Sequence, residues 1–242
     1  MRQFSTNFST KNTQSQAYQT VVVVDSGVGM VALLDKLQAL PVHLMYLNIY
    51  GATTNSDANQ FVSSHIQQLD DTRPFALVVP SKCPNLRAIS ASFDRCSVVK
   101  VTPPLYQAMQ YSTTRVALLS STNARCDDCK TIDATHLAKL ITNLAPQRQI
   151  RQQIEHCLSM ADGCDAVVFD DCIFSTQKHN FWMLAPNVKF FDCTDSVASI
   201  FYKNKKLRQN KQTPQLTTHF CDKTGKTEQI FDKIFQKIYK PY

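Results

Sequence analysis

Long apolar runs and glycine are both scarce in this sequence. No stretch approaches the roughly 18 consecutive apolar residues that a membrane-spanning helix needs, because aspartates interrupt the most apolar segments, VVVVDSGVGMVALL and DAVVFDDCIF. We therefore expect a soluble protein without a membrane partner. Glycine accounts for 5 of the 242 residues, about 2% against a usual ~7%, so most turns must be built from other residues.

The first 19 residues contain neither an acidic side chain nor an apolar segment. The missing apolar segment argues against a secretory signal, and we expect residues 1–19 to be a flexible tail rather than an organelle transit peptide. The protein is thus expected in the cytoplasm, with its nine cysteines reduced. Cys126 and Cys129 form a CDDC tetrad with no second ligand pair, so we expect two ordinary thiols at a helix start and no metal site.

The formal net charge is +7, and the basic run KNKKLRQNK at residues 203–211 holds much of the excess. No aromatic residue interrupts this run, and no nucleic-acid-binding motif accompanies it. A solvated connecting segment is therefore expected there rather than a nucleic-acid site. Positive charge spread over the chain would favour a small anionic substrate.

Short β-branched runs alternate with segments of helical periodicity. Strands that are apolar on both faces and alternate with helices indicate the α/β class, with parallel sheets covered on both sides. We expect residues 135–144 to be partly strand and Trp182 to lie in the core. The remaining expected strands are residues 21–25, 43–49, 75–80, 97–102, 115–121, 165–170 and 188–192. The expected helices include residues 31–40, 58–69, 105–112, 195–204 and 149–161, the last with Ile150, Ile154, Cys157, Leu158 and Ala161 on one face.

In such sheets the ligand binds at the carboxyl ends of the strands. The pattern therefore predicts where a site lies, although it says nothing about the type of reaction. The residues that end the apolar runs are Asp25 and Ser26, Tyr50 and Gly51, Ser81 to Cys83, Ser120 and Ser121, Asp170 to Cys172, and Asp192 and Cys193.

Several segments, in chain order, resemble those of glutamate racemases, in the Asp/Glu racemase superfamily. The strand and turn VVVVDSGVGM resembles the family's amino-terminal signature, with Met30 in the place of a glycine. The later segments that resemble the family are IYGATTNSDANQFVSSHI, SVVKVTPPLYQAM, CDAVVFDDC, KFFDCTDSVA and THFCDKTGKTEQIFDKIFQKIY. The resemblance covers roughly residues 20–242, and the order of the motifs carries it.

This resemblance implies two flavodoxin-like α/β domains with parallel sheets, related by a pseudo-twofold axis, with the active-site cleft between them. Residues 20–102 and 213–242 would form the first domain, and residues 103–212 the second. The family inverts the α-carbon of an acidic amino acid, glutamate or aspartate, without a cofactor. The resemblance further implies a homodimer and a role in supplying peptidoglycan precursors.

Racemisation without a cofactor needs a base on one face of the α-carbon and an acid on the other. The family uses two cysteines, one from each domain, and a thiolate at pH 7 requires a lowered pKa. The family residues that match Asp25 and Ser26 lie beside this site, so the resemblance implies the same place for these two residues. Tyr50 and Gly51 match the family's loop after the second strand, where the resemblance implies that they bind the substrate.

The first cysteine motif of the family, VV-A-C-N-T, corresponds to VV-P-S-K-C here. Without a gap, Ser81 occupies the cysteine position, Lys82 the asparagine position and Cys83 the threonine position. A shift of two residues recovers Cys83 as the thiol at a helix start. In the register without a gap, Lys82 would either activate Ser81, or point to solvent or hold a carboxylate, which makes it a candidate substrate-binding residue.

The second motif, L-G-C-T-H, corresponds to F-D-D-C-I here. Asp171 falls on the cysteine position and Cys172 on the threonine position. Asp171 would act as a carboxylate base, or the two adjacent aspartates would only cap the next helix.

Two main hypotheses follow from the resemblance. The first is a cofactor-independent racemase or isomerase that uses Cys83 and Cys172 in shifted registers. The second is a non-catalytic racemase-fold protein, with Ser81 and Asp171 in the catalytic places, that binds a small anionic ligand or a protein partner. A third, a one-base lyase or isomerase, shares the same scaffold. The positions of the sulfur atoms separate the first two.

Overall fold

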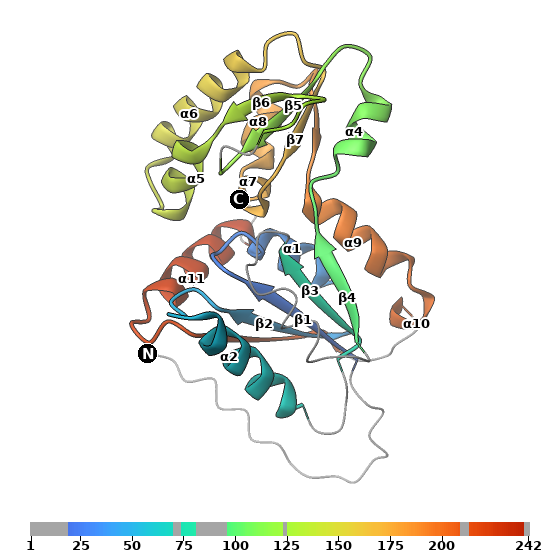
Figure 1. Ribbon diagram of the computed structural model, residues 1–242, viewed down its shortest axis with the longest axis vertical. Coiled ribbons are helices and arrows are strands. Elements are labelled where there is room, and N and C mark those ends of the chain that lie inside the picture. Colours follow the sequence, from blue (N-terminus) through green and yellow to red (C-terminus); the bar gives the residue numbers. More distant parts are fainter. Residues whose placement is uncertain (1–18, 70–73, 81–95, 123–124, 209–212, 240–242) are drawn as a thin grey trace.

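The computed structural model describes residues 19–69, 74–80, 96–122, 125–208 and 213–239. Within these ranges the chain forms two parallel sheets, one above the other in Figure 1. The first sheet has five strands in the order β4 (Ser97–Val101), β3 (Ala76–Pro80), β1 (Thr20–Asp25), β2 (His43–Asn48) and β9 (Gln215–Phe220). The second has four strands in the order β6 (Lys130–Asp133), β5 (Val116–Ser120), β7 (Ala166–Phe169) and β8 (Lys189–Phe191).

The first sheet is covered on both faces because its central strand is apolar on both. All six residues of β1 are buried, and alternate side chains of a strand point to opposite faces. Val21 and Val23 pack with the helices α1 (Val31–Leu37) and α11 (Lys226–Tyr239). Val22 and Val24 pack on the other face with α2 (Asn55–Gln67).

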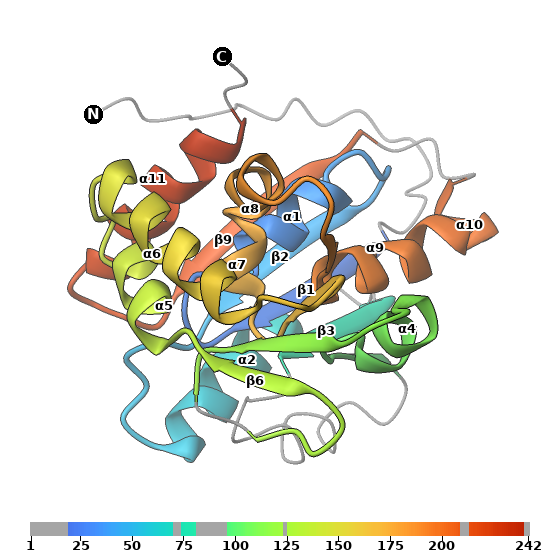
Figure 2. The same ribbon diagram turned by 90° about the horizontal axis from the view of Figure 1, so that it is seen from above.

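The second sheet is covered in the same way. The helices α5 (Thr135–Thr142), α6 (Gln147–Met160) and α8 (Lys178–Leu184) pack on one face, and α4 (Leu105–Tyr111) packs on the other. Figure 2 shows α5, α6 and α11 together on one side of the molecule and α4 with α10 (Lys205–Arg208) on the opposite side.

One core of buried side chains joins the two sheets. It runs from Val23 of β1 to Leu119 of β5 and includes Phe201 of α9 (Cys193–Lys203). Helix α1 packs against α9 and against the short helix α7 (Cys172–Ser175). The carboxyl ends of both sheets therefore face each other across a shared interior.

The predicted fold class is confirmed: two parallel α/β sheets lie in one chain. The first sheet draws its strands from the two sequence ranges assigned to the first domain, and the domain boundaries themselves stay predictions. Among the described residues, no helix has both the length and the apolar character that crossing a membrane needs.

Three local expectations were wrong. Residues 135–142 are fully helical, with Leu137 and Ile141 buried one turn apart. The tetrad of Cys126 and Cys129 precedes strand β6 and does not begin a helix. Trp182 is 55% exposed, because its neighbour Phe181 is the residue that α8 buries.

The basic run is also more structured than expected. Lys203 ends α9, and the following residues from Lys205 to Arg208 form α10, which buries Leu207 in the core. The described part of the run therefore continues from α9 into a second short helix, and its residues beyond Arg208 lie outside the described ranges.

Candidate functional site

A cavity of about 190 Å³ lies where the carboxyl ends of the two sheets face each other. At roughly 30 Å³ for each water molecule, this volume holds about six waters, or one small ligand. The polar residues in its described lining are Asp25, Ser26, Thr142, Asp170, Asp171, Cys172 and Cys193. All of these except Thr142 are residues that the sequence pattern predicted at the ends of strands.

The turn after β1 is organised around the carboxylate of Asp25. Its Oδ1 accepts a hydrogen bond from the backbone N–H of Gly27 at 3.0 Å. Its Oδ2 accepts from the backbone N–H of Met30 and from the hydroxyl of Tyr46, both at 2.9 Å. Burial raises the pKa of Asp25 to about 6, although these hydrogen bonds oppose the rise. Asp25 is therefore a buried carboxylate that titrates near neutral pH.

Strand β2 supports this turn from the neighbouring position in the sheet. Asn48 is fully buried, and its Nδ2 donates to the Tyr46 hydroxyl at 2.9 Å and to the carbonyl of Gly27. Its Oδ1 accepts from the backbone N–H of Tyr50 at 2.9 Å. Tyr46 and Asn48 lie on one face of β2, and both hold the cavity wall in place.

Tyr50 and Gly51 are not among the described residues that line the cavity. Tyr50 is 58% exposed. Gly51 has a φ of +91°, and a Cβ at this position would lie 3.2 Å from the Cα of Asp222. The structure thus gives Gly51 a backbone role, at a turn that packs against the segment after β9.

The facing wall is the turn after β7. Asp170 accepts hydrogen bonds from the Ser120 hydroxyl at 2.7 Å and from the backbone N–H of Ser121 at 2.9 Å. Asp171 caps α7 by accepting from the N–H of Ile173 at 2.9 Å, and it also accepts from the Ser121 hydroxyl at 2.9 Å. Capping was one of the two alternatives for Asp171, and the same side chain also lines the cavity.

The two turns touch at Gly29. A Cβ at this position would lie 3.0 Å from the backbone N of Ile173 and 3.1 Å from Oδ1 of Asp171. The missing side chain therefore allows the two walls to approach each other. As a result, the negative charge of Asp171 contributes to the raised pKa of Asp25.

Two thiols complete this wall. The Sγ atoms of Cys172 and Cys193 lie 2.9 Å apart, and both residues are buried. Two causes raise the pKa of Cys172 well above the ordinary value for a thiol. The larger is the hydrogen bond with Cys193, and the second is burial. A cysteine that removes an α-proton at neutral pH needs a lowered thiol pKa. The pKa of Cys172 is shifted in the opposite direction. The sequence pattern predicted Cys193 at the end of a strand, but it did not predict the contact between Cys193 and Cys172.

Ser81, Lys82 and Cys83 lie outside the described residues. Pro80, the last described residue before them, lines the cavity. Among the described lining residues none carries a positive charge.

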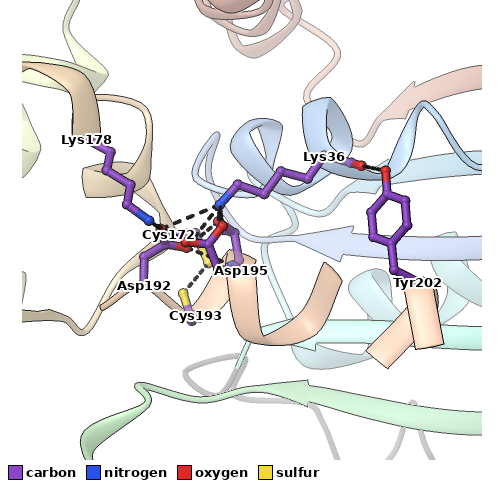
Figure 3. Close-up of polar contacts among 8 residues, drawn as sticks. Lys36, Cys172, Lys178, Asp192, Cys193, Asp195 and Tyr202 are labelled. Carbon is purple, nitrogen blue, oxygen red and sulfur yellow. Dashed lines mark hydrogen bonds and ion pairs between the residues drawn. The ribbon is translucent and has the colours of Figure 1, made fainter. Parts of the chain in front are cut away.

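A charged cluster joins the two sheets beside the cavity (Figure 3). Asp192 caps α9 by accepting from the N–H of Asp195 at 2.8 Å. Its buried carboxylate contacts Nζ of Lys36 from α1 at 3.3 Å and Nζ of Lys178 from α8 at 2.6 Å. Burial would raise the pKa of Asp192, but the two lysines hold it below its usual range. Tyr202 of α9 also donates to the carbonyl of Lys36 at 2.7 Å.

No group of three or more potential metal-ligating side chains occurs in the part of the chain that the structure describes. No protein-family model matches the sequence, and no curated protein matches it.

Solved structures do match this chain. The glutamate racemase of Escherichia coli, solved with L-glutamate and the activator UDP-MurNAc-ala, has a TM-score of 0.64 at 17% identity, over 91% of this chain and 95% of that one. The Francisella tularensis glutamate racemase, solved with D-glutamate, has a TM-score of 0.63 at 13% identity, over 91% and 94%. Isoform RacE1 from Bacillus anthracis has a TM-score of 0.62 at 15% identity, over 90% and 94%. This chain therefore has a glutamate racemase-like fold.

Proposed function

We propose that this protein, which has a glutamate racemase-like fold, binds a small acidic amino acid, glutamate or aspartate, in the cavity between its two sheets. The observation that carries the proposal is the pair of carboxylates on facing turns, Asp25 and Asp171, at the cavity wall. Two carboxylates beside each other attract a cation, so the α-ammonium group of the ligand would pair with them. Ser26 is exposed in the same wall and would donate to the ligand carboxylate.

The proposed ligand also carries two carboxylates, and these need cationic or N–H partners. Pro80 lines the cavity and Lys82 comes two residues later in the sequence, so we propose Lys82 as the partner of a ligand carboxylate. Two of the solved neighbours contain L-glutamate and D-glutamate, which supports an acidic amino acid as the ligand class.

Binding without racemisation agrees best with the chemistry of the described wall. Cys172 donates to or accepts from Cys193, and its raised pKa keeps it protonated at neutral pH. A protonated thiol is a poor base for an α-proton. We therefore propose a binding protein on the racemase scaffold.

Cofactor-independent racemisation is the second candidate function. It is favoured by one observation, the position of Cys172 in the cavity wall. In this alternative Cys83 would supply the second thiol, while Ser81 or Asp171 would assist.

Ligand binding is tested by isothermal titration calorimetry with L- and D-glutamate and L- and D-aspartate. Asp171→Asn keeps an oxygen that can cap α7 but removes the charge, so we expect about a tenfold loss of affinity, about 1.4 kcal/mol. Asp162→Asn changes an exposed carboxylate elsewhere and should leave the affinity unchanged. No heat of binding from any of the four ligands, or equal affinities for the two variants, would contradict the proposal.

The pH dependence of binding tests the role of Asp25. Its pKa of about 6 means that the carboxylate is charged above pH 6 and becomes protonated below it. Pairing with an ammonium group needs the charged form, so affinity should be constant above about pH 7 and fall by up to tenfold for each pH unit below 6. Circular dichroism at each pH controls for unfolding. An affinity that rises towards pH 5 would show that Asp25 does not pair with the ammonium group.

Exchange of the α-proton in deuterated water separates the two candidate functions. For a binding protein we expect thermal stabilisation by the ligand and no exchange in the wild type. Exchange that is lost in both Cys83→Ala and Cys172→Ala, and retained in Cys96→Ala, would establish the racemase instead.

A further inference from the structure

An Asp-Cys pair follows each of two neighbouring strands. Strands β7 and β8 pair in parallel, with Val168 opposite Phe191. Each strand is followed by an aspartate that caps a helix and by a cysteine that begins it: Asp171 and Cys172 for α7, and Asp192 and Cys193 for α9. The same local structure on adjacent strands brings the two thiols together.

The contact between these thiols is close enough for a covalent bond to form with a small movement. Their Sγ atoms lie 2.9 Å apart as free thiols, and a disulfide bond is about 2.05 Å long. Both residues line the cavity, whereas no other described cysteine does. A small reagent that enters the cavity therefore meets both sulfur atoms.

We propose that Cys172 and Cys193 form a redox-active dithiol site that a small peroxide converts into an intramolecular disulfide. In the first step one thiol releases its proton and its thiolate attacks an oxygen of hydrogen peroxide. The O–O bond breaks, a sulfenic acid forms, and the leaving hydroxide takes up the proton to become water. In the second step the other sulfur displaces the sulfenic hydroxyl group, which leaves as water with the thiol proton. Together the two thiols lose two electrons and two protons, and hydrogen peroxide is reduced to two molecules of water.

The environment of the pair determines the outcome of oxidation. Cys193, burial, Asp171 and Asp25 all raise the pKa of Cys172, so the thiolate of Cys172 is scarce and its attack on peroxide is slow. The second step is intramolecular between sulfur atoms already in contact, so it is fast. The disulfide therefore forms before further oxidation to sulfinic acid. This inference concerns the thiols alone and does not depend on the proposed function.

The test is peptide mapping of the full-length protein after hydrogen peroxide treatment. Remaining thiols are alkylated, and the protein is digested with trypsin without reduction. Trypsin separates residues 152–178, which contain Cys157, Cys164 and Cys172, from residues 190–203, which contain only Cys193. We expect these two peptides to be joined, at two hydrogen masses below their sum, and to separate after reduction.

Variants identify the partner of Cys193. The joined peptide should persist in Cys157→Ser and Cys164→Ser and disappear in Cys172→Ser. Fragmentation of the wild-type peptide gives the same assignment if Cys172→Ser fails to fold. Two results would overturn the proposal: a bond that maps to Cys157 or Cys164, or two separate peptides under conditions that oxidise other cysteines of the chain.

Discussion

At the scale of single residues, two of the glycines stand where a side chain would not fit or where the backbone requires glycine. Gly29 allows the turn after β1 to touch the turn after β7, and Gly51 has a positive φ. Met30, which replaces a glycine of the racemase motif, is buried and contributes its side chain to the core. Glycine thus allows a close approach at position 29, whereas a buried side chain occupies position 30 of the same turn.

Gly29→Ala tests this close approach. The new Cβ would lie 3.0 Å from the backbone of Ile173, so the two turns must separate, and we expect a loss of about 1–3 kcal/mol in the free energy of unfolding. Gly27→Ala is the matched control, because nothing lies within 4 Å of a Cβ there, and it should change stability by less than about 0.5 kcal/mol. Urea denaturation measures both. Equal losses of unfolding free energy in the two variants would mean that the contact between the turns does not exclude a side chain at position 29.

At the scale of secondary structure, hydrophobic periodicity predicted the elements that bury a continuous apolar face. The run of four valines became β1, and Ile150, Ile154 and Cys157 became the buried face of α6. Strand β6 escaped prediction because Ile132 is its only buried residue. Residues 135–144 were expected to be partly strand, but packing of Leu137 and Ile141 makes residues 135–142 helical.

Ile154→Ala tests the buried face of α6. Ile154 is fully buried, so the substitution leaves a cavity, and we expect a loss of about 2–5 kcal/mol in the free energy of unfolding. Gln152→Ala changes an exposed residue of the same helix and should have little effect. Thermal and urea unfolding give the comparison. Similar stabilities of the two variants would mean that α6 contributes little to the core.

At the scale of the whole molecule, the site depends on contacts that no local pattern reveals. The sequence placed Asp25, Asp171 and Cys172 at strand ends, and all three line the cavity. It did not reveal the contact between Cys172 and Cys193 or the pairing of Lys36 with Asp192 across the two sheets. Such contacts join residues far apart in the chain, and only the packed fold fixes them.

Replacing both lysines tests whether this cluster holds the two sheets together. Lys36→Met or Lys178→Met alone leaves one cation on Asp192, so each should cost about 1 kcal/mol or less. The double variant leaves a buried carboxylate without a cation, and we expect a more than additive loss of about 3 kcal/mol. Arg151→Met removes an exposed pair with Glu155 and is the control.

The same experiment has a defined pH dependence. The folded-state pKa of Asp192 is lowered, so its stabilisation is fully present above the unfolded value, about 3.9, and is lost as the pH falls below it. The difference between the wild type and the double variant should therefore shrink in acid. Small, additive losses at neutral pH would contradict a role for the cluster in joining the sheets.

The order of strands in the first sheet also constrains how the chain folds. Residues 43–48 of β2 pair with residues 215–220 of β9, and the whole second sheet lies between them in the sequence. Until β9 docks, β2 presents an open edge of unpaired N–H and C=O groups, which is a template for pairing between molecules. The aggregation hazard that this edge of β2 presents therefore belongs to the synthesis and refolding of the protein, in the interval before β9 pairs with it.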